Sequence, residues 1–153
     1  MVSIDLSREE LLKEARDYLT QQTAGFLAST GSAGLRVSPV SIFIDSEMGI
    51  YLHCFGGDKL INLRENPEAC LLVIEEKWTL DPGIFAGVQL FGKAYEISPF
   101  SDKYLEAEKW CPYTHKADMT LLELSLDKIV LVDYVGENKS KRKRSIELEA
   151  LKT

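Results

Sequence analysis

Residues 50–73 read IYLHCFGGDKLINLRENPEACLLV, and this stretch decides the fold class. Its apolar and aromatic start predicts a β-strand over residues 50–54, and a pair of glycines then interrupts the strand pattern. Apolar residues at helical spacing predict a short helix over residues 58–64, which an Asn-Pro pair ends. The apolar run that follows predicts a buried strand over residues 69–75. The stretch is therefore strand, turn, helix and strand, with short connections.

The flanking sequence continues this pattern. Ser7 and Glu10 form a capping box ahead of apolar residues spaced three and four apart, which predicts an amphipathic helix over residues 8–21. Glycine-containing turns then separate short runs rich in apolar and β-branched residues, as expected for antiparallel hairpins. The remaining elements are expected as strands over residues 25–29, 35–44, 88–97 and 121–135 and a helix over residues 101–110.

The expected strands and helices do not alternate as they would in a parallel sheet. Six strands with three short helices in this order favour a closed antiparallel barrel over a doubly wound sheet. A chain of 153 residues is one domain's worth and can bury a core without disulfides or a structural metal. The longest connection without expected structure, residues 77–87, is a candidate pocket or interface loop.

Charge is unevenly distributed along the chain. The 18 basic and 24 acidic side chains give a net charge of -6, but residues 139–153 carry six bases and two acids. The rest of the chain is therefore strongly acidic, at -10, which disfavours nonspecific binding of nucleic acid. We expect a folded domain over residues 1–137 and a flexible basic tail over residues 138–153. Binding of nucleic acid or an acidic partner by this tail is the less favoured alternative.

Three features predict a cytoplasmic protein without a membrane segment. The apolar runs are strand-sized, far below the roughly 18 residues that a membrane-spanning helix needs. The N-terminal residues show neither a basic leader nor an apolar signal core. Three cysteines, an odd number without CxxC spacing, are typical of a reducing compartment.

Common catalytic and metal-binding motifs are absent from the sequence. It contains no GxGxxG, no P-loop, no HExxH and no GxSxG. His53, Cys54, Cys111 and His115 have side chains that zinc prefers, but their spacing matches no common zinc motif, and adjacent strand residues point to opposite faces. We therefore favour ordinary packing roles for these four residues and predict no metal site.

One constellation of residues favours an anion site. Gly56 and Gly57 allow backbone N–H groups to approach a ligand, and the first turn of the following helix points unpaired N–H groups outward. Lys59 in that turn adds a positive charge, and Arg36 on a neighbouring strand could clamp a phosphate through two hydrogen bonds. Each feature alone is more often structural, as a turn, a solvated lysine or a surface ion pair. Their joint spacing favours phosphate binding.

The same segments resemble the pyridoxamine 5'-phosphate oxidase-like family of FMN-binding split barrels. The resemblance is carried by three segments: RVSPV at residues 36–40, the stretch already quoted at residues 50–73, and VQLFGKAYEI at residues 88–97. Its most specific element is K-x-x-N-L-x-x-N-P, from Lys59 to Pro67. The resemblance implies a six-stranded antiparallel split β-barrel with Greek-key connections and short flanking helices. It also implies a homodimer with one FMN in each of two clefts between the subunits.

The resemblance further implies which residues bind FMN. In chain order they are Arg36, Val37, Ser38, Pro39, His53, Cys54, Lys59 and Gln89. Arg36 and Lys59 would hold the phosphate. Val37, Ser38 and Pro39 would lie along the isoalloxazine ring. The His-Cys pair at the end of the third strand would lie near the flavin. Gln89 would contact the cofactor from the partner subunit.

The sequence departs from the true oxidases in ways that weaken vitamin B6 chemistry but not FMN binding. Asp58 stands where those enzymes have a second basic residue, and we expect it to cap the helix instead. His53 replaces a small hydroxyl residue, and no arginine-rich substrate signature follows residue 135.

The resulting expectation is an FMN-dependent oxidoreductase acting on a small molecule, with reduced nicotinamide as a plausible electron source. The alternative is a flavin-binding protein without turnover, serving electron transfer, storage or sensing. Trp110 and Tyr113 offer flat surfaces for stacking, although packing at the barrel end is the favoured role. No residue stands out as a catalytic acid or base.

Overall fold

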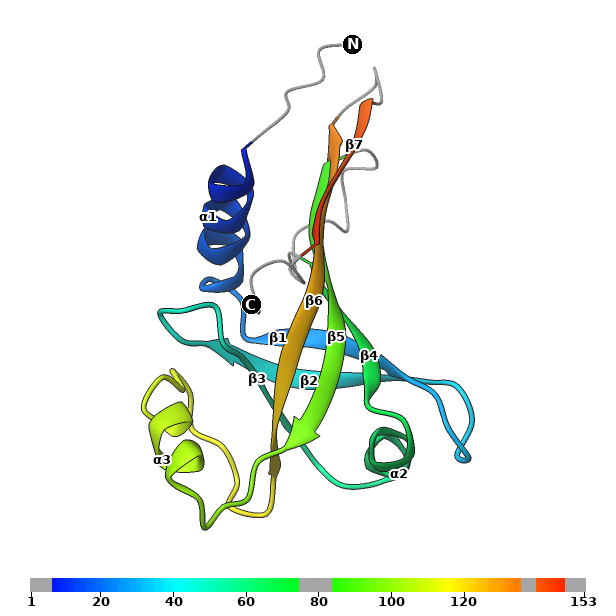
Figure 1. Cartoon of the computed structure of the whole chain (residues 1–153), viewed down its shortest axis with the longest axis vertical. Coiled ribbons are helices and arrows are strands. Elements are labelled where there is room, and N and C mark those ends of the chain that lie inside the picture. The colour runs from blue at the N-terminus through cyan, green and yellow to red at the C-terminus, as the bar shows by residue number, and fades with distance from the viewer. Residues whose placement is uncertain (1–6, 75–83, 136–139, 148–153) are drawn as a thin grey trace.

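The computed structural model describes residues 7–74, 84–135 and 140–147 (Figure 1). The element bounds are α1 Arg8–Leu19, β1 Ala24–Ser29, β2 Arg36–Ile44, β3 Ile50–Cys54, α2 Asp58–Glu65, β4 Glu68–Ile74, β5 Ile84–Glu96, α3 Asp102–Glu108, β6 Thr120–Val135 and β7 Ser140–Glu147. Each expected helix and strand is present, and β3 has its expected bounds. Strand β7 is an addition that the sequence pattern did not predict.

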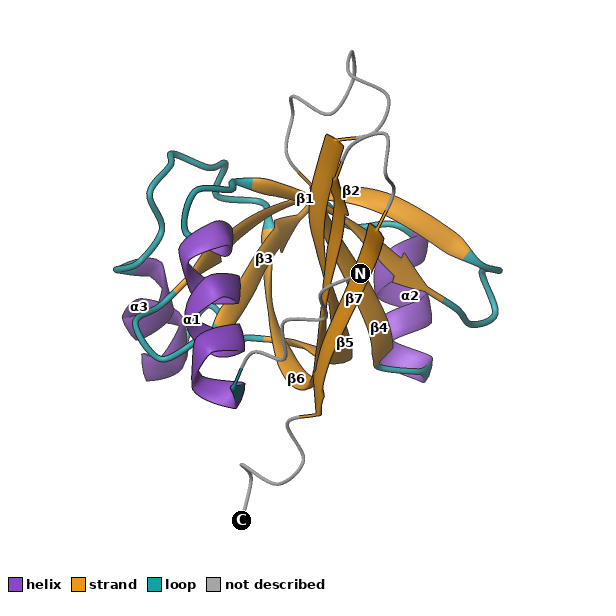
Figure 2. Cartoon of the chain, turned by 90° about the horizontal axis from the view of Figure 1, so that it is seen from above, coloured by secondary structure: helices purple, strands orange, loops and turns teal. Residues whose placement is uncertain are grey.

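Six of the strands close into a barrel. The hydrogen-bonded order is β3-β2-β1-β4-β5-β6-β7, every pair is antiparallel, and β3 also pairs with β6. This last pairing joins the two ends of the six-stranded sheet and so closes it. Figure 2 shows α1 and α3 on one side of the strands and α2 on the other. The predicted six-stranded antiparallel split barrel is confirmed.

Strand β6 pairs with different partners along one edge. Its residues 120–124 pair with β3, whereas residues 128–135 pair with β7. Because β3 begins at Ile50, opposite Leu124, the distal half of β6 would otherwise present unpaired backbone groups, and β7 pairs with them. Within the expected basic tail over residues 138–153, residues 140–147 form this strand, and residues 138–139 and 148–153 lie outside the described residues.

A bulge lies in the long β5–β6 pair. The register shifts between Phe91 and Gly92, so that these two residues face the three residues 126–128 of β6. A Cβ on Gly92 would lie far inside van der Waals contact with the Ser125 carbonyl group. Only glycine permits this approach, which gives the glycine of the VQLFGKAYEI segment a structural role.

Helix α1 packs its apolar stripe onto the barrel core. The expected capping box is present: Ser7 Oγ accepts the Glu10 N–H at 3.2 Å, and the Glu10 carboxylate accepts the Ser7 N–H at 3.0 Å. Ala15 and Leu19 are buried against the barrel residues, and Leu11, Leu12 and Tyr18 pack around them. The spacing of these apolar residues in the sequence therefore identified the buried face correctly.

Two apolar clusters organise the interior. The larger fills the barrel, and the smaller, built around Phe43, Tyr51 and Leu121, lies between the outer side of the barrel and α3. Strand β3 is buried on both faces because it separates the two clusters. Its last two residues are divided between them, since Cys54 belongs to the barrel core and the ring of His53 lies 5.3 Å from that of Phe43.

Part of one prediction lies outside the described residues. The expected loop over residues 77–87 includes residues up to 83, which the structure does not describe, and β5 already begins at Ile84. Among the described residues, no helix combines the length and apolar character needed to cross a bilayer.

Candidate functional site

The expected anion-binding residues meet where β2 and α2 begin. We call this region the α2 corner: Arg36, Gly56, Gly57, Asp58 and Lys59. Gly57 precedes the helix with φ of 123°, a conformation that favours glycine. A Cβ built on either glycine would meet nothing within 4 Å, so the space over this turn is open. The first turn of α2 therefore borders space that a ligand can enter.

Arg36 already has partners within the chain. Its Nη2 atom lies 2.8 Å from Asp58 Oδ2, and the two side chains are 48% and 52% exposed. Its Nε donates to the Ala33 carbonyl at 3.2 Å. The expected cap by Asp58 is wrong, because Gly57 is the N-cap and Asp58 is the first helical residue. The Asp58 carboxylate instead orients Arg36 and competes with any anion for it.

A buried asparagine fastens α2 to the turn before β2. The side chain of Asn62 is fully buried, its amide donates to the Gly34 carbonyl at 2.7 Å, and its Oδ1 accepts the Ala33 N–H at 3.0 Å. One turn later Glu65 accepts the Ser32 N–H at 2.8 Å. Asn62 is the first asparagine of the K-x-x-N-L-x-x-N-P element. The sequence showed this motif without showing that its asparagine positions the start of β2.

The residues after Arg36 alternate between the two faces of β2. Val37 is 68% exposed and Pro39 is also exposed, whereas Ser38 is half-buried and faces the other way. Pro39 pairs with Phe26 of β1, which is 44% exposed. The outer face of β1 and β2 is therefore an apolar surface to which Ser38 contributes no side chain.

Gln89 lies on the same outer face but at a distance. Pairing across β2, β1, β4 and β5 places Pro39, Phe26, Leu72 and Gln89 in one row. With about 4.8 Å between neighbouring strands, Gln89 lies roughly 14 Å from Pro39 along the curved sheet. Within one chain, Gln89 is therefore three strands away from Pro39.

Cys54 lies beneath the α2 corner in the barrel core. Its side chain is 2% exposed. Burial raises the pKa of the Cys54 thiol, and the positive charge of Lys59 opposes this rise. The thiol and the ammonium group are thus close enough to interact electrostatically, although Cys54 offers no surface to a ligand.

His53 is placed elsewhere, in a polar group that we call the His53 cluster: His53, Glu108, Cys111, Tyr113 and His115. Its side chain is fully buried, with Nε2 2.6 Å from Glu108 Oε1 and Nδ1 2.9 Å from the Tyr113 hydroxyl. His115 Nε2 lies 2.8 Å from Glu108 Oε2, and the two imidazole rings stack with centroids 3.9 Å apart. One carboxylate therefore bridges two histidines.

The hydrogen-bond partners assign the protons in this cluster. His115 Nδ1 lies 3.1 Å from the Lys116 carbonyl oxygen, which only accepts, so His115 donates from both nitrogens and is an imidazolium. His53 donates from Nε2 to Glu108 and accepts at Nδ1 from Tyr113, which leaves it neutral. The Cys111 thiol donates to the Tyr113 carbonyl at 3.2 Å. The cluster then has no net charge, as a buried polar group requires.

The pKa shifts agree with this assignment. Burial lowers the pKa of His53, against the opposing influence of Glu108. For His115, burial favours the neutral form, but the hydrogen bonds to Glu108 and Lys116 outweigh it and raise the pKa. The pKa of Glu108 is lowered, because the hydrogen bonds from the two histidines outweigh its partial burial.

Glu108 was missed by sequence reasoning. It lies within the expected helix over residues 101–110, where an acidic side chain is most often solvated, and no local pattern links it to His53. Tyr113, a candidate for flavin stacking, instead packs edge-on against Phe43 and His53. The favoured packing role for Tyr113 is the one that the structure shows.

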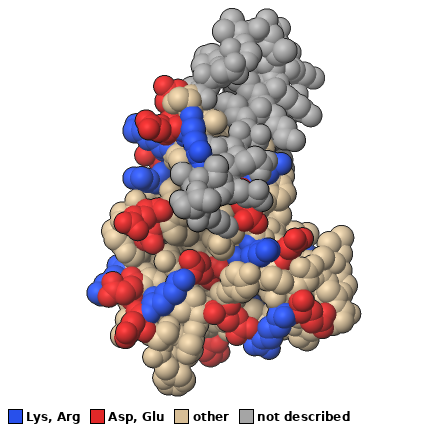
Figure 3. Space-filling model, in the orientation of Figure 1, with Lys and Arg blue, Asp and Glu red and all other residues tan. Residues whose placement is uncertain are grey.

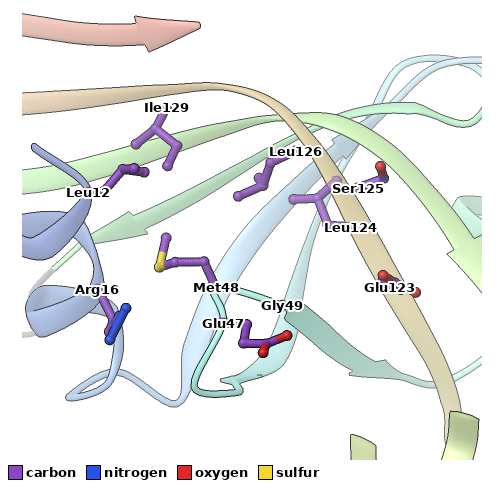
Figure 4. A pocket seen from close by; sticks show the side chains of 10 residues that line it. All are labelled: Leu12, Arg16, Glu47, Met48, Gly49, Glu123, Leu124, Ser125, Leu126 and Ile129. Atoms are coloured by element: carbon purple, nitrogen blue, oxygen red, sulfur yellow. The ribbon is translucent and has the colours of Figure 1, made fainter. Parts of the chain in front are cut away.

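A separate cavity lies between α1, the β2–β3 turn and β6 (Figure 4). Its volume is about 410 Å³, with Leu12, Met48 and Ile129 around it and Arg16 and Glu47 at one side. None of the FMN-binding residues expected from the sequence lines it. The face of the molecule in Figure 3 intersperses acidic and basic side chains, so the described part of that face shows no single-sign patch.

The family model described as pyridoxamine 5'-phosphate oxidase matches residues 11–133. The chain belongs to this family. The match covers the whole barrel up to the distal half of β6, and it includes both the α2 corner and the His53 cluster. No curated protein sequence matches the chain.

Solved structures with a similar fold come from proteins that are described in different ways. A heme binding protein from Mycobacterium smegmatis is 21% identical, with a TM-score of 0.73 over 97% of this chain and 61% of that one. A Clostridium acetobutylicum protein related to general stress protein 26 of B. subtilis, described as of the pyridoxinephosphate oxidase family, is 14% identical, with a TM-score of 0.67 over 97% and 99%. An FAD-binding protein from Mesorhizobium loti is 18% identical, with a TM-score of 0.63 over 81% and 90%. At these identities the likeness shows the fold alone.

Proposed function

We propose that this member of the pyridoxamine 5'-phosphate oxidase family is an FMN-binding oxidoreductase that acts on a small molecule. The observation that carries the proposal is the α2 corner, where Arg36 and Lys59 flank an open diglycine turn at a helix N-terminus. Helix N–H groups, a lysine and a guanidinium are the donors that a phosphate ester prefers. In the proposed complex the phosphate displaces the Asp58 carboxylate from Arg36.

The outer face of β1 and β2 is the proposed support for the isoalloxazine ring. Val37 and Pro39 would lie along the ring, and the exposed Phe26 would extend the apolar surface. Because Gln89 lies three strands away from Pro39 in one chain, a second copy would have to supply it. The proposed cofactor site is therefore complete only in a homodimer, in which the exposed apolar residues would be covered.

The flavin would supply the transfer of an electron pair, and the protein would supply position and electrostatics. Arg36 and Lys59 would fix the phosphate, and the apolar face of β2 would keep water from one side of the ring. Reduced nicotinamide is the proposed electron source. The described cysteines Cys54, Cys70 and Cys111 are all free thiols, which supports a reducing, cytoplasmic location.

The cofactor proposal is tested by the double variant Arg36→Ala/Lys59→Ala. Purified parent protein should be yellow and carry about one FMN per chain, and the variant should lose the cofactor on desalting, since each charge-assisted contact is worth roughly 1.5–3 kcal/mol. The matched control is Arg64→Ala/Lys103→Ala, which removes the same two residue types from exposed ion pairs with Glu96 and Glu123. FMN retention by the α2-corner variant at the parent's level would show that the site is misplaced.

Two alternatives are separated by further measurements. A flavin protein without turnover, serving electron transfer or storage, predicts that bound flavin stays oxidised after anaerobic mixing with NADH or NADPH. Heme binding is suggested by the structural similarity to the heme binding protein of Mycobacterium smegmatis, and it predicts a saturable change in the hemin absorption spectrum. Hemin saturation together with no flavin retention by the parent would replace the FMN proposal.

A further inference from the structure

The His53 cluster joins residues that are distant in the sequence. His53 lies near the end of β3, Glu108 ends α3, and Cys111 and His115 lie in the loop that follows (Figure 1). One ligand atom from each of His53, Cys111 and His115 lies within 4.8 Å of the others. Two imidazoles, a thiol and a carboxylate are the donor types that zinc prefers.

We propose that His53, Cys111 and His115 bind a Zn²⁺ ion, with Glu108 as the fourth ligand. This site is independent of the proposed flavin function, because it shares no residue with the α2 corner. In a tetrahedral zinc site, nitrogen and sulfur donors lie about 3.3–3.6 Å apart. The ligand atoms of His53, Cys111 and His115 therefore need to approach one another by no more than about 1.5 Å. Glu108 is placed beside them by its contacts of 2.6 and 2.8 Å with the two Nε2 atoms.

The orientation of both histidines supports the site. Each directs Nε2 toward the carboxylate at the centre of the cluster, and each has an oxygen atom on its other nitrogen. For His115 the outer partner is the Lys116 carbonyl, and for His53 it is the Tyr113 hydroxyl, which can accept from Nδ1 as well as donate to it. Histidines that bind metals have such a partner on the outer nitrogen, because it fixes the tautomer and the ring orientation.

The charge of the cluster also suits a divalent cation. Without metal, the carboxylate of Glu108 balances the imidazolium of His115. Zn²⁺ would displace one proton from His115 Nε2 and one from the Cys111 thiol, so two positive charges enter as two leave. The proton of neutral His53 would move from Nε2 to Nδ1, where the Tyr113 hydroxyl turns to accept it, and Nε2 is then free to bind the ion. The buried cluster stays neutral, and the proposed exchange places no unpaired charge beside the fully buried His53.

The site is structural in character. All four ligand positions are filled by side chains, and Glu108 and His115 are only 19% and 17% exposed, so no open position remains for a substrate. Bound zinc would join the loop after α3 to β3. It would then stabilise the folded chain by mass action.

The deciding experiment uses the purified chain of 153 residues, without prior removal of any flavin that it retains. Co²⁺ and Zn²⁺ are added separately, with metal content measured after gel filtration and cobalt spectra recorded before and after addition of excess zinc. We expect about one ion per chain, visible cobalt bands of tetrahedral geometry, and a thiolate-to-cobalt charge-transfer band that zinc removes. Absence of the charge-transfer band in the parent chain would overturn the proposal by itself.

Variants then assign the ligands. Cys111→Ser and His115→Gln should each weaken zinc binding at least about 10-fold, and Cys111→Ser should remove the thiolate band. The matched control Cys70→Ser changes a free cysteine of β4 and should leave both readouts at the parent's level. Equal losses in the Cys70 and Cys111 variants would contradict the assignment. Flavin content is measured on the same samples, so failure of the α2 corner and failure of the zinc site are distinguishable.

Discussion

The α2 corner and the His53 cluster differ in how their charged groups are satisfied. In the α2 corner, Arg36 and Asp58 are each about half exposed and form one ion pair beside an open turn. In the His53 cluster, a nearly buried Glu108 bridges two histidines, and His53 is fully buried. The corner depends on water or a ligand for its remaining hydrogen bonds. The cluster satisfies its groups within the chain.

This difference indicates that the α2 corner contributes mainly to ligand binding and the His53 cluster mainly to folding stability. Exposed ion pairs contribute little to folding, at most about 1 kcal/mol, so the charges of the corner are available for a ligand. Removing one member of a buried polar network leaves its partners unsatisfied, which is costly. We therefore expect variants of the corner to change binding and variants of the cluster to change stability.

The largest effect on stability is expected for Glu108→Ala. Loss of the carboxylate leaves His53 buried without its Nε2 partner, which should lower the free energy of unfolding by about 2–3 kcal/mol. Urea unfolding in the presence of a metal chelator measures this loss without a contribution from bound metal. Arg36→Ala in the same assay should change stability by less than about 1 kcal/mol. Similar losses of unfolding free energy in Glu108→Ala and Arg36→Ala would contradict the proposed difference between the His53 cluster and the α2 corner.

Asn62→Ala is expected to lower both the stability of the fold and the retention of FMN. It leaves the Gly34 carbonyl and the Ala33 N–H without their partner, which should cost about 1–3 kcal/mol of stability. Because Asn62 holds the turn before Arg36, FMN retention should fall as well. The control Asn66→Ala removes a single hydrogen bond, 3.2 Å long, to the Glu68 N–H and should spare the cofactor. Unchanged FMN retention in the Asn62 variant would show that the turn does not position Arg36 for binding.

Asp58→Asn should improve FMN binding by about fivefold, on the order of 1 kcal/mol, because it removes the carboxylate that competes for Arg36. Fluorescence titration of the apoprotein measures the dissociation constant, and the gain should shrink at high salt. Asp102→Asn is the matched control, since Asp102 occupies the first turn of α3. Weaker binding in the Asp58 variant would mean that its carboxylate orients Arg36 more than it competes.

The smallest effect is a dependence of stability on alkaline pH. Burial, together with the charge and hydrogen bond of Asp45, raises the pKa of Tyr51 to about 12. Because the unfolded chain loses this proton near pH 10, the stabilisation is complete below about pH 10 and disappears as the pH rises toward about 12. Tyr51→Phe should therefore lose less stability than the parent between pH 9 and 11 in urea unfolding. The half-exposed Tyr95 provides the control variant Tyr95→Phe, and equal slopes for parent and Tyr51→Phe would contradict the prediction.

The sequence by itself determined the elements and the family. The apolar period identified the buried stripe of α1, the turn residues separated the strands, and the Lys59–Pro67 element placed a helix after β3. These are local properties, since they depend on residues within one or two turns of each other. The joint spacing of Arg36 and Lys59 also indicated the corner that the structure assembles.

Only the tertiary structure decided which side chains meet. Alternation along β3 separates His53 from Cys54, and the chain reversal through α3 brings Glu108, Cys111 and His115 to His53. Tertiary structure also decided the partner of Asp58, which pairs with Arg36, 22 positions earlier, instead of capping its own helix. It likewise decided the place of β7, which pairs with the part of β6 that β3 does not reach. Such contacts depend on long-range strand pairing and burial, because a backbone edge or a buried charge takes its partner from whichever segment the fold places beside it.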